Sequence, residues 1–304
     1  MDKRRVTGTI DKEYRTQLEL RSFARRENER SRRSRLDGDC EDWEMPSLFV
    51  VGGGLFGSLA AACARARGIE AIVFDSSRSG AASSAAAGLF KESWAGRKLH
   101  RHYHRALPLL EQLYPICALS LEGDEGNRDS HLFVPPSIIL EPSPIRQSVE
   151  TVGDGWLEAG GRRYEGWIYI AAGVWSPQFL PGLEVIGKAG AAFVYPGERA
   201  GRTRRFEDGR QAIAFVRAPG TTYFSDGTAE RDYTEEHERL SLRRAERMGL
   251  SEPSVRLWGR RPYTKGGPFF ERVAGRTWLA TGGRKMGTIL GASFARRLVE
   301  EEIG

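Results

Sequence analysis

The feature that most constrains this chain is a glycine-rich turn between a strand-like segment and a helix-like one. Residues 48–60 read LFVVGGGLFGSLA, with four glycines within six positions. Glycine weakens both strands and helices, so its concentration at this junction indicates a need for backbone without side chains. The turn contains the pattern GxGxxG as Gly52, Gly54 and Gly57. Placed between a strand and a helix, this pattern predicts a site where a diphosphate approaches bare backbone.

The residues after the turn complete a βαβ unit of the kind that binds dinucleotides. Residues 58–67 read as a helix, and a second strand, IEAIVFD, ends at Asp75. In such a unit Gly52 permits the tight turn, Gly54 leaves room for the pyrophosphate and Gly57 lets the helix pack close to the strand. The helix N-terminus offers free N–H groups to the phosphates. The carboxylate of Asp75 stands where it can accept hydrogen bonds from a ribose.

Charge and cysteine content exclude some classes of protein and leave others open. Among 304 residues, 46 Lys and Arg exceed 40 Asp and Glu, for a net charge of +6. This balance fits an anionic cofactor, an acidic substrate or nucleic acid equally well. Cys40, Cys63 and Cys117 are far apart, so they indicate neither a zinc site nor a disulfide framework. With no apolar run of about 18 residues and no signal peptide, the sequence predicts a soluble protein of the reducing cytoplasm, without a membrane partner.

Residues 1–44 differ in composition from the rest of the chain. They hold 12 Lys or Arg and 11 Asp or Glu, with few large apolar residues. This composition predicts a disordered or loosely helical charged extension. A flexible arm that touches nucleic acid is a second interpretation, and a start of translation at Met45 is a third.

The remaining sequence alternates between apolar runs and amphipathic segments. Strand-like runs occupy parts of 155–173, 189–229 and 278–283, the first of them joined by a Gly-Gly turn. Helical periodicity marks 99–116, 234–249 and 288–302.

Four stretches, in order along the chain, resemble the D-amino acid oxidase and glycine oxidase family of FAD-dependent oxidoreductases. They are FVVGGGLFGSLAA with FDSSRSGAASSAAAGLF, then IAAGVWS at 170–176, WGRRPYTKGGPFF at 258–270 and WLATGGRKMGTILGASFARRLVEE from Trp278. The resemblance implies an α/β fold, in which a Rossmann-like parallel-sheet domain binds FAD and a mostly antiparallel α+β substrate domain is inserted. We assign 46–99, 144–185 and 256–304 to the FAD-binding domain, and 100–143 and 186–255 to the substrate domain.

The resemblance also implies which residues contact FAD. A Ser- and Ala-rich loop places Ser83 and Ser84 against the pyrophosphate and the flavin. The glycine-rich turn before Thr288 can present N–H groups to the electron-rich edge of a reduced flavin. The residues expected to bind FAD are Gly52, Gly54, Leu55, Phe56, Gly57, Asp75, Ser76, Ser83, Ser84, Ala172, Gly173, Trp175, Gly283, Arg284, Lys285, Met286, Gly287 and Thr288.

Members of this family oxidise the C–N bond of an amine or amino acid to an imine, and oxygen then reoxidises the flavin. The resemblance implies that Arg261 grips a substrate carboxylate, a task that suits the two-pronged guanidinium; neighbouring Arg260 is a rival for this role. Lys285 is expected near the flavin, where it can meet substrate or oxygen. Tyr223 and Tyr263 are expected to line the pocket, although core packing is the alternative for at least one of them.

Two departures from the family pattern concern activity and cofactor binding. Lys265-Gly266-Gly267 stands where members have x-Asp-Gly, and the interval 136–171 is short at the end expected to cover the adenine. These departures keep a flavin-binding protein without turnover as one alternative. The basic charge of the chain keeps another, the same chemistry on an amino-acid-modified nucleobase in DNA or RNA.

The segment HRHYHR at 100–105 raises the possibility of a metal site. His100 and His104 are four residues apart, so one helix face presents both. No third ligand stands at a suitable spacing, and Arg101 and Arg105 favour an exposed basic helix instead. We therefore predict no metal.

Overall fold

The computed structural model describes residues 5–6 and 47–304. The predictions for the charged extension 1–44 and for a start at Met45 lie outside the described residues, apart from the short strand β1 (Arg5–Val6), which pairs with β5 (Cys117–Glu122).

A sheet of five strands carries the predicted βαβ unit. Its order is β16-β17-β10-β2-β3, and all neighbours are parallel except the edge strand β16. The strands are β2 (Leu48–Val51), β3 (Ala71–Phe74), β10 (Trp167–Ile170), β17 (Thr277–Thr281) and β16 (Phe269–Ala274).

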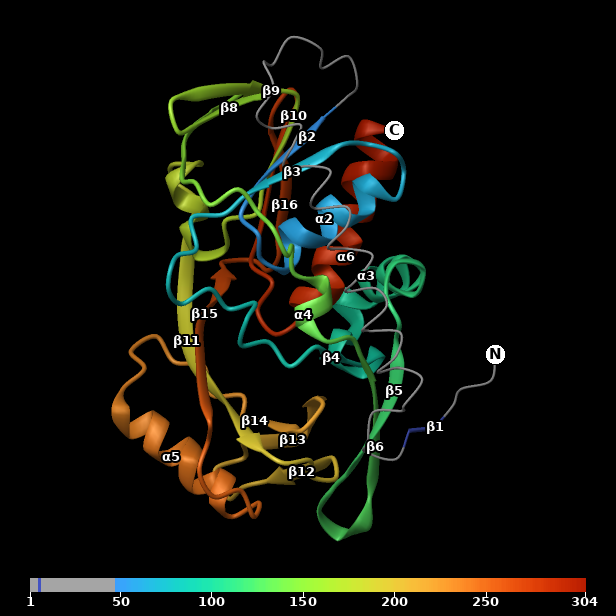
Figure 1. The fold of residues 1–304 in the computed structure, drawn as a ribbon, viewed down its shortest axis with the longest axis vertical. Coiled ribbons are helices and arrows are strands. Elements are labelled where there is room, and N and C mark those ends of the chain that lie inside the picture. The colour runs from blue at the N-terminus through green and yellow to red at the C-terminus, as the bar shows by residue number, and fades with distance from the viewer. Residues whose placement is uncertain (1–4, 7–46) are drawn as a thin grey trace.

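Helices cover one face of this sheet and a small antiparallel sheet covers the other (Figure 1). Alternate residues of β2 point to opposite faces, as strand geometry requires. Val50 packs with the helices, and Phe49 packs toward the small sheet. The helices are α2 (Leu55–Arg65), α3 (Glu92–Leu113) and α6 (Gly287–Arg297), the last continued by a π-helical turn η3 (Leu298–Ile303). The small sheet consists of β7 (Val149–Gly153), β8 (Trp156–Ala159) and β9 (Arg162–Glu165).

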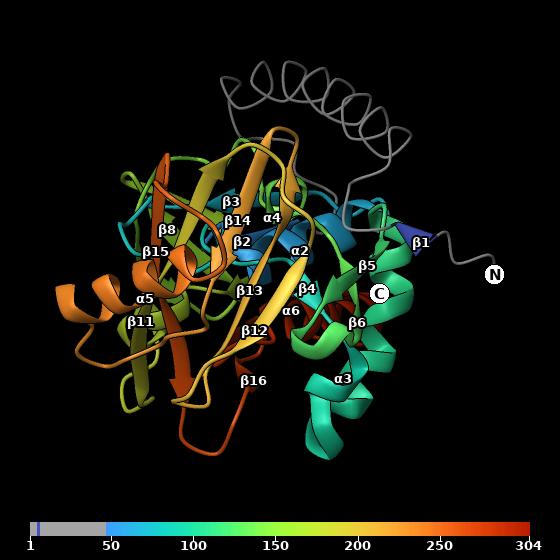
Figure 2. The same cartoon turned by 90° about the horizontal axis from the view of Figure 1, so that it is seen from below.

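A larger, mostly antiparallel sheet forms the other half of the molecule (Figure 2). Its order is β15-β11-β14-β13-β12-β5-β6-β4, and α5 (Glu235–Glu246) packs on it through Ala245 and Leu242. The remaining strands are β4 (Leu89–Phe90), β6 (Arg128–Phe133), β11 (Val185–Pro196), β12 (Arg202–Arg205), β13 (Gln211–Ala218), β14 (Thr221–Ser225) and β15 (Val255–Thr264). Three short helices, η1 (Asp124–Gly126), α4 (Pro136–Ile139) and η2 (Gly173–Gln178), lie between strands.

The predicted fold class, a parallel α/β sheet with a mostly antiparallel second sheet, is confirmed. The domain boundaries stay a prediction. One strand crosses them, since β15, assigned to the FAD-binding part, pairs with β11 along the larger sheet. Within the described part of the chain, no helix is long and apolar enough to cross a membrane.

Candidate cofactor and substrate site

A cavity of about 790 Å³ opens where the four parallel strands end. The carboxyl ends of β2, β3, β10 and β17 all border it, through Val51, Phe74, Ala171 and Thr281. Strands β3 and β10 flank β2 on opposite sides, so the chain order reverses there. In open α/β sheets this reversal leaves a crevice at the carboxyl ends, and ligands bind in it.

The glycine turn forms the floor of this cavity. Gly52 has φ 106°, and a Cβ there would lie 2.6 Å from the carbonyl oxygen of Ala171. A Cβ on Gly54 would lie 2.8 Å from Ser83 Oγ, inside the cavity wall. Gly57 does not line the cavity; a Cβ there would lie 1.9 Å from Gly52 O, so its glycine lets α2 pack against the turn. Side chains are thus excluded where the diphosphate was predicted.

The acidic residue at the end of β3 points back to the turn. Asp75 Oδ2 accepts the N–H of Gly53 at 2.5 Å, and Oδ1 accepts the N–H of Ser77 at 2.6 Å. A carboxylate has about four lone-pair sites, so capacity remains for ribose hydroxyls. Asp75, Ser76 and Trp175 of η2 all line the cavity.

Of the two serines predicted to contact the cofactor, the serine-rich loop places only Ser83 in the cavity lining. Leu55 N–H, the first of α2, donates to Ser83 Oγ at 2.9 Å. Ser84 instead donates to Ala81 O at 3.2 Å, is exposed and does not line the cavity.

An arginine that the sequence analysis missed holds this loop to the larger sheet. Arg217 Nη1 donates to Ala86 O at 2.9 Å, and the guanidinium stacks 4.9 Å from the ring of Tyr223. The Tyr223 hydroxyl donates to Ala85 O at 2.8 Å, and burial raises its pKa. Tyr223 therefore both lines the cavity and anchors its wall.

The second glycine-rich turn brings the N-terminus of α6 to the cavity. All residues of this turn from Gly283 to Thr288 line it. A Cβ on Gly283 would lie 2.9 Å from the ring of Phe56, so the two turns pack closely. Met286 is the N-cap residue of α6, but its side chain forms no capping hydrogen bond. The first turn of α6 contains no acidic residue. The N–H groups and positive dipole end of α6 are available to negative charge.

Cationic side chains gather at the end of the cavity that faces the larger sheet. Arg261 is half-buried and donates from Nη1 to Thr228 O at 3.4 Å. Among the described residues, neither Arg261 nor Lys285 forms a salt bridge, whereas Arg210 pairs with Glu230 at 2.7 Å. Partial desolvation, together with the charges of Arg261 and Arg210, lowers the pKa of Lys285.

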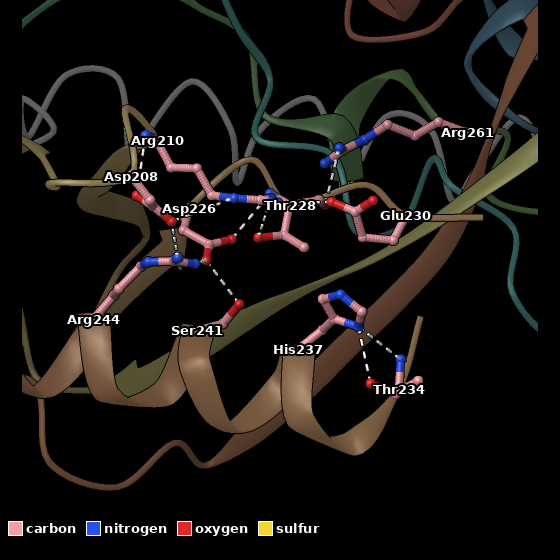
Figure 3. A network of polar contacts seen from close by, with 10 residues as sticks. All are labelled: Asp208, Arg210, Asp226, Thr228, Glu230, Thr234, His237, Ser241, Arg244 and Arg261. Carbon is pink, nitrogen blue, oxygen red and sulfur yellow. Dashed lines mark hydrogen bonds and ion pairs between the residues drawn. The ribbon is translucent and has the colours of Figure 1, made fainter. Parts of the chain in front are cut away.

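A buried aspartate organises the loop behind Arg261 (Figure 3). Asp226 Oδ1 accepts the N–H of Thr228 at 3.0 Å, and Oδ2 accepts the hydroxyl of Ser241 at 2.8 Å. Arg244 of α5 pairs with the same carboxylate. Burial opposes ionisation of Asp226, but these hydrogen bonds lower its pKa below the usual value.

Two neighbours of Arg261 on β15 lie differently. Tyr263 does not line the cavity; the centre of its ring lies 5.1 Å from Lys188 Nζ and 5.3 Å from the Arg284 guanidinium. Arg260 is exposed and borders the cavity.

The structure thus brings most of the predicted residues together at one cavity. Gly57, Ser84 and Tyr263 stand apart from its lining. The predicted residues that line it are Gly52, Gly54, Leu55, Phe56, Asp75, Ser76, Ser83, Ala172, Gly173, Trp175, Tyr223, Arg261, Gly283, Arg284, Lys285, Met286, Gly287 and Thr288. The bare backbone, the carboxylate and the two helix N-termini fit a dinucleotide such as FAD.

Comparison with known families decides between the dinucleotides. Residues 47–123, which contain the glycine turn, Asp75 and the serine-rich loop, match the family model DAO, FAD dependent oxidoreductase. The match confirms the resemblance to the DAO family. It also confirms FAD as the cofactor and an FAD-dependent oxidoreductase as the class of enzyme. Among curated proteins, no sequence matches the chain.

Solved structures share the fold over most of the chain. Iminodiacetate oxidase from Chelativorans sp. BNC1 is 16% identical, with a TM-score of 0.63 over 84% of this chain and 95% of that one. Glycine oxidase from Bacillus cereus ATCC 14579 is also 16% identical, with a TM-score of 0.61 over the same shares. L-proline dehydrogenase from P. horikoshii is 13% identical, with a TM-score of 0.64 over 84% and 94%. The fold shared with these structures therefore extends well beyond residues 47–123.

Proposed function

We propose that this protein oxidises the C–N bond of a small amine that carries a carboxylate, and gives an imine. One observation carries the proposal: several cations line the cavity beyond the parallel strands, and two of them, Arg261 and Lys285, form no salt bridge among the described residues. Uncompensated positive charge in a partly desolvated site favours an anionic ligand.

FAD would lie with its diphosphate on Gly52 and Gly54, its ribose at Asp75 and its flavin toward the N-terminus of α6. When bound, FAD supplies the two-electron oxidation of the amine carbon. The free N–H groups of α6 would meet the negative charge of a reduced ring. In this placement Thr288 and Lys285 lie on the flavin side of the site.

The protein's side chains would position the substrate rather than react with it. Arg261 would bind the carboxylate through two parallel hydrogen bonds, and Lys285 would add a second positive charge. Tyr223 would close the wall opposite, held by its own bond to Ala85. Orientation of this kind supplies much of the acceleration when the chemistry belongs to a cofactor.

The names of proteins with the same fold support an amine or amino acid as substrate. They include iminodiacetate oxidase, glycine oxidase and L-amino acid deaminase from Proteus vulgaris. The word oxidase in the first two names also supports oxygen as the acceptor that reoxidises the flavin, whereas the name L-proline dehydrogenase supports a different acceptor as the alternative. A cytoplasmic location is part of the proposal, and the free thiols of Cys63 and Cys117 agree with it.

Peroxide release tests the proposal across a panel of amines. Glycine, sarcosine, iminodiacetate and D-amino acids are each supplied with oxygen, and in parallel with an artificial electron-accepting dye. Turnover of a carboxylate-bearing amine, but not of its amide or ester, is the expected result. Turnover with dye alone would exclude oxygen as acceptor. Salt-sensitive binding to RNA or DNA without turnover of any free amine would instead favour a modified nucleobase.

A further inference from the structure

Three polar side chains of α3 converge outside the lining of the cofactor cavity. Glu92 Oε1 lies 2.7 Å from His100 Nε2 and 3.2 Å from His104 Nε2. The two Nε2 atoms lie 3.0 Å from each other. Each side chain is about half exposed, at 53–54%. The three possible ligand atoms therefore form a small triangle that opens to solvent.

Hydrogen bonding alone does not satisfy this triangle. A neutral imidazole nitrogen carries either one proton or one lone pair, and an ionised carboxylate only accepts. If Nε2 of His100 donates its proton to Glu92, that nitrogen has no lone pair to offer to His104. When Nε2 of His104 is also protonated, its N–H faces the N–H of His100. When Nε2 of His104 is unprotonated, its lone pair faces the oxygen of Glu92. One side of the triangle stays repulsive in every tautomer.

A single cation at the centre removes this conflict, because all three atoms can then offer lone pairs to it. Zinc binds imidazole nitrogen at about 2.0–2.1 Å and carboxylate oxygen at about 2.0–2.2 Å, in tetrahedral geometry. Ligand atoms around such an ion are about 3.3 Å apart. The observed separations of 2.7, 3.0 and 3.2 Å approach this value, so a small outward shift suffices.

A bend in α3 makes the third ligand available. On a straight helix, residues eight apart are separated by about 12 Å, so Glu92 would not reach His100. Gly96 interrupts the helix with φ 54° and ψ −174°, and the first turn folds back toward His100 and His104. A Cβ on Gly96 would meet nothing within 4 Å, so the backbone conformation, not crowding, calls for glycine there.

We propose that Glu92, His100 and His104 bind one zinc ion, with water in the fourth position. Two imidazoles and a carboxylate are a ligand set that zinc accepts, and exposure gives the ion a path from solvent. The ion would tie the first turn of α3 to the rest of the helix across Gly96. Because α3 packs on α6, this clamp would stabilise the helical layer next to the cofactor cavity.

Equilibrium dialysis of the untagged, full-length holoenzyme against Zn²⁺ tests the site, with bound metal measured by mass spectrometry. We expect about one ion per chain. His100→Asn and Glu92→Gln each remove a ligand, so zinc affinity should fall by at least about 10- to 100-fold, the usual cost of losing even an outer partner. His237→Asn removes a histidine of α5 that makes no contact with the triangle, and it should leave zinc affinity unchanged.

Further measurements keep the test independent of folding and of flavin chemistry. Circular dichroism and flavin absorbance show that each variant is folded and loaded. Gly96→Ala, which disfavours the bend but keeps all three ligands, should also weaken zinc binding. Zinc should raise the Tm of the wild type and not that of His100→Asn. Equal zinc affinity in the wild type, His100→Asn and Glu92→Gln would overturn the proposal, as would no binding by the folded wild type.

Discussion

Arg261 Nη1 donates to the carbonyl oxygen of Thr228 at 3.4 Å, so backbone rather than a carboxylate steadies this guanidinium. The N–H of the same Thr228 donates to the buried Asp226 at 3.0 Å. The negative charge of Asp226 is compensated by Arg244, on the far side of the loop (Figure 3). The positive charge of Arg261 therefore remains available to a substrate.

Replacing Arg261 by Ala should impair substrate binding much more than flavin binding. Hydrogen bonds to charged groups are worth about 1.5–3 kcal/mol, so kcat/KM for a carboxylate substrate should fall about 10- to 150-fold, mostly through KM. Steady-state kinetics and the flavin spectrum measure the two effects. Arg256→Ala is the matched control, because Arg256 is on the same strand but pairs with Glu238 outside the cavity. Equal KM values for wild type and Arg261→Ala would remove Arg261 from the site.

Replacing Asp226 by Asn should destabilise the protein strongly. Loss of one partner from a buried ion pair costs about 3–5 kcal/mol, and the side chains of Asp226 and Arg244 are 0% and 12% exposed. Asp208→Asn is the control, since it removes a partly exposed partner of the same arginine, worth about 0–1 kcal/mol. Denaturant unfolding compares the two variants. Similar losses of free energy of unfolding in the two variants would show that the buried carboxylate of Asp226 stabilises the protein no more than the partly exposed carboxylate of Asp208.

The difference in free energy of unfolding between the wild type and Asp226→Asn should become smaller at acidic pH. The pKa of Asp226 is lowered in the folded state, so its stabilising effect is complete above the unfolded value of about 4. That effect is lost as the pH falls through the folded pKa. Free energies of unfolding measured between neutral and strongly acidic pH should therefore converge at the acidic end. A difference that stays constant over this range would contradict the assigned pKa.

As the pH rises, the affinity for a carboxylate should begin to fall at a lower pH than it would if Lys285 had the pKa of an ordinary lysine. Desolvation and neighbouring arginines lower the pKa of Lys285 from 10.5, so its positive charge is lost earlier as the pH rises. A carboxylate inhibitor without an amine keeps a constant charge in this range, so its Ki isolates the enzyme group. Lys285→Arg stays protonated and should abolish this limb of the profile. Parallel profiles for both proteins would exclude Lys285 from the anion site.

A side chain on Gly54 should weaken FAD binding while leaving the fold intact. Gly54 has φ −71°, which any residue adopts, and its Cβ would enter the cavity beside Ser83 Oγ. Gly54→Ala and Gly54→Ser should both lower FAD affinity by about tenfold or more, equivalent to about 1.4 kcal/mol. Serine is a good N-cap and alanine is not, so their Tm values should differ. Full flavin retention in both variants would show that the diphosphate lies elsewhere.

The parts of the site that the sequence predicts are those built from local segments. The strand, the glycine turn and the helix follow one another within residues 48–60, and Asp75 ends the adjacent strand. The spacing GxGxxG predicts a task for each glycine, although Gly52 and Gly54 lie against Ala171 and Ser83, which are distant in sequence. Such a pattern of strand, glycine turn, helix and acidic residue can be recognised without knowledge of the rest of the chain.

Other parts depend on contacts between distant segments. The bond from Arg217 to Ala86 spans 131 residues, and no period or motif marks it. The direction of the Tyr263 ring is set by Lys188 and Arg284, one from the neighbouring strand and one from the second glycine turn. The place of Glu92 beside His100 requires the bend at Gly96, and both Glu92 and Gly96 lie before the segment 99–116 in which the sequence shows helical periodicity.

Anaerobic titration of the flavin absorbance with candidate amines tests whether cofactor and substrate meet in this cavity. The purified protein should be yellow, and a carboxylate-bearing amine should bleach the oxidised flavin band, with restoration when oxygen is admitted. Arg261→Ala should need a much higher amine concentration for the same bleaching. A colourless protein that FAD does not reconstitute, or a flavin that no such amine bleaches, would contradict the proposed oxidation.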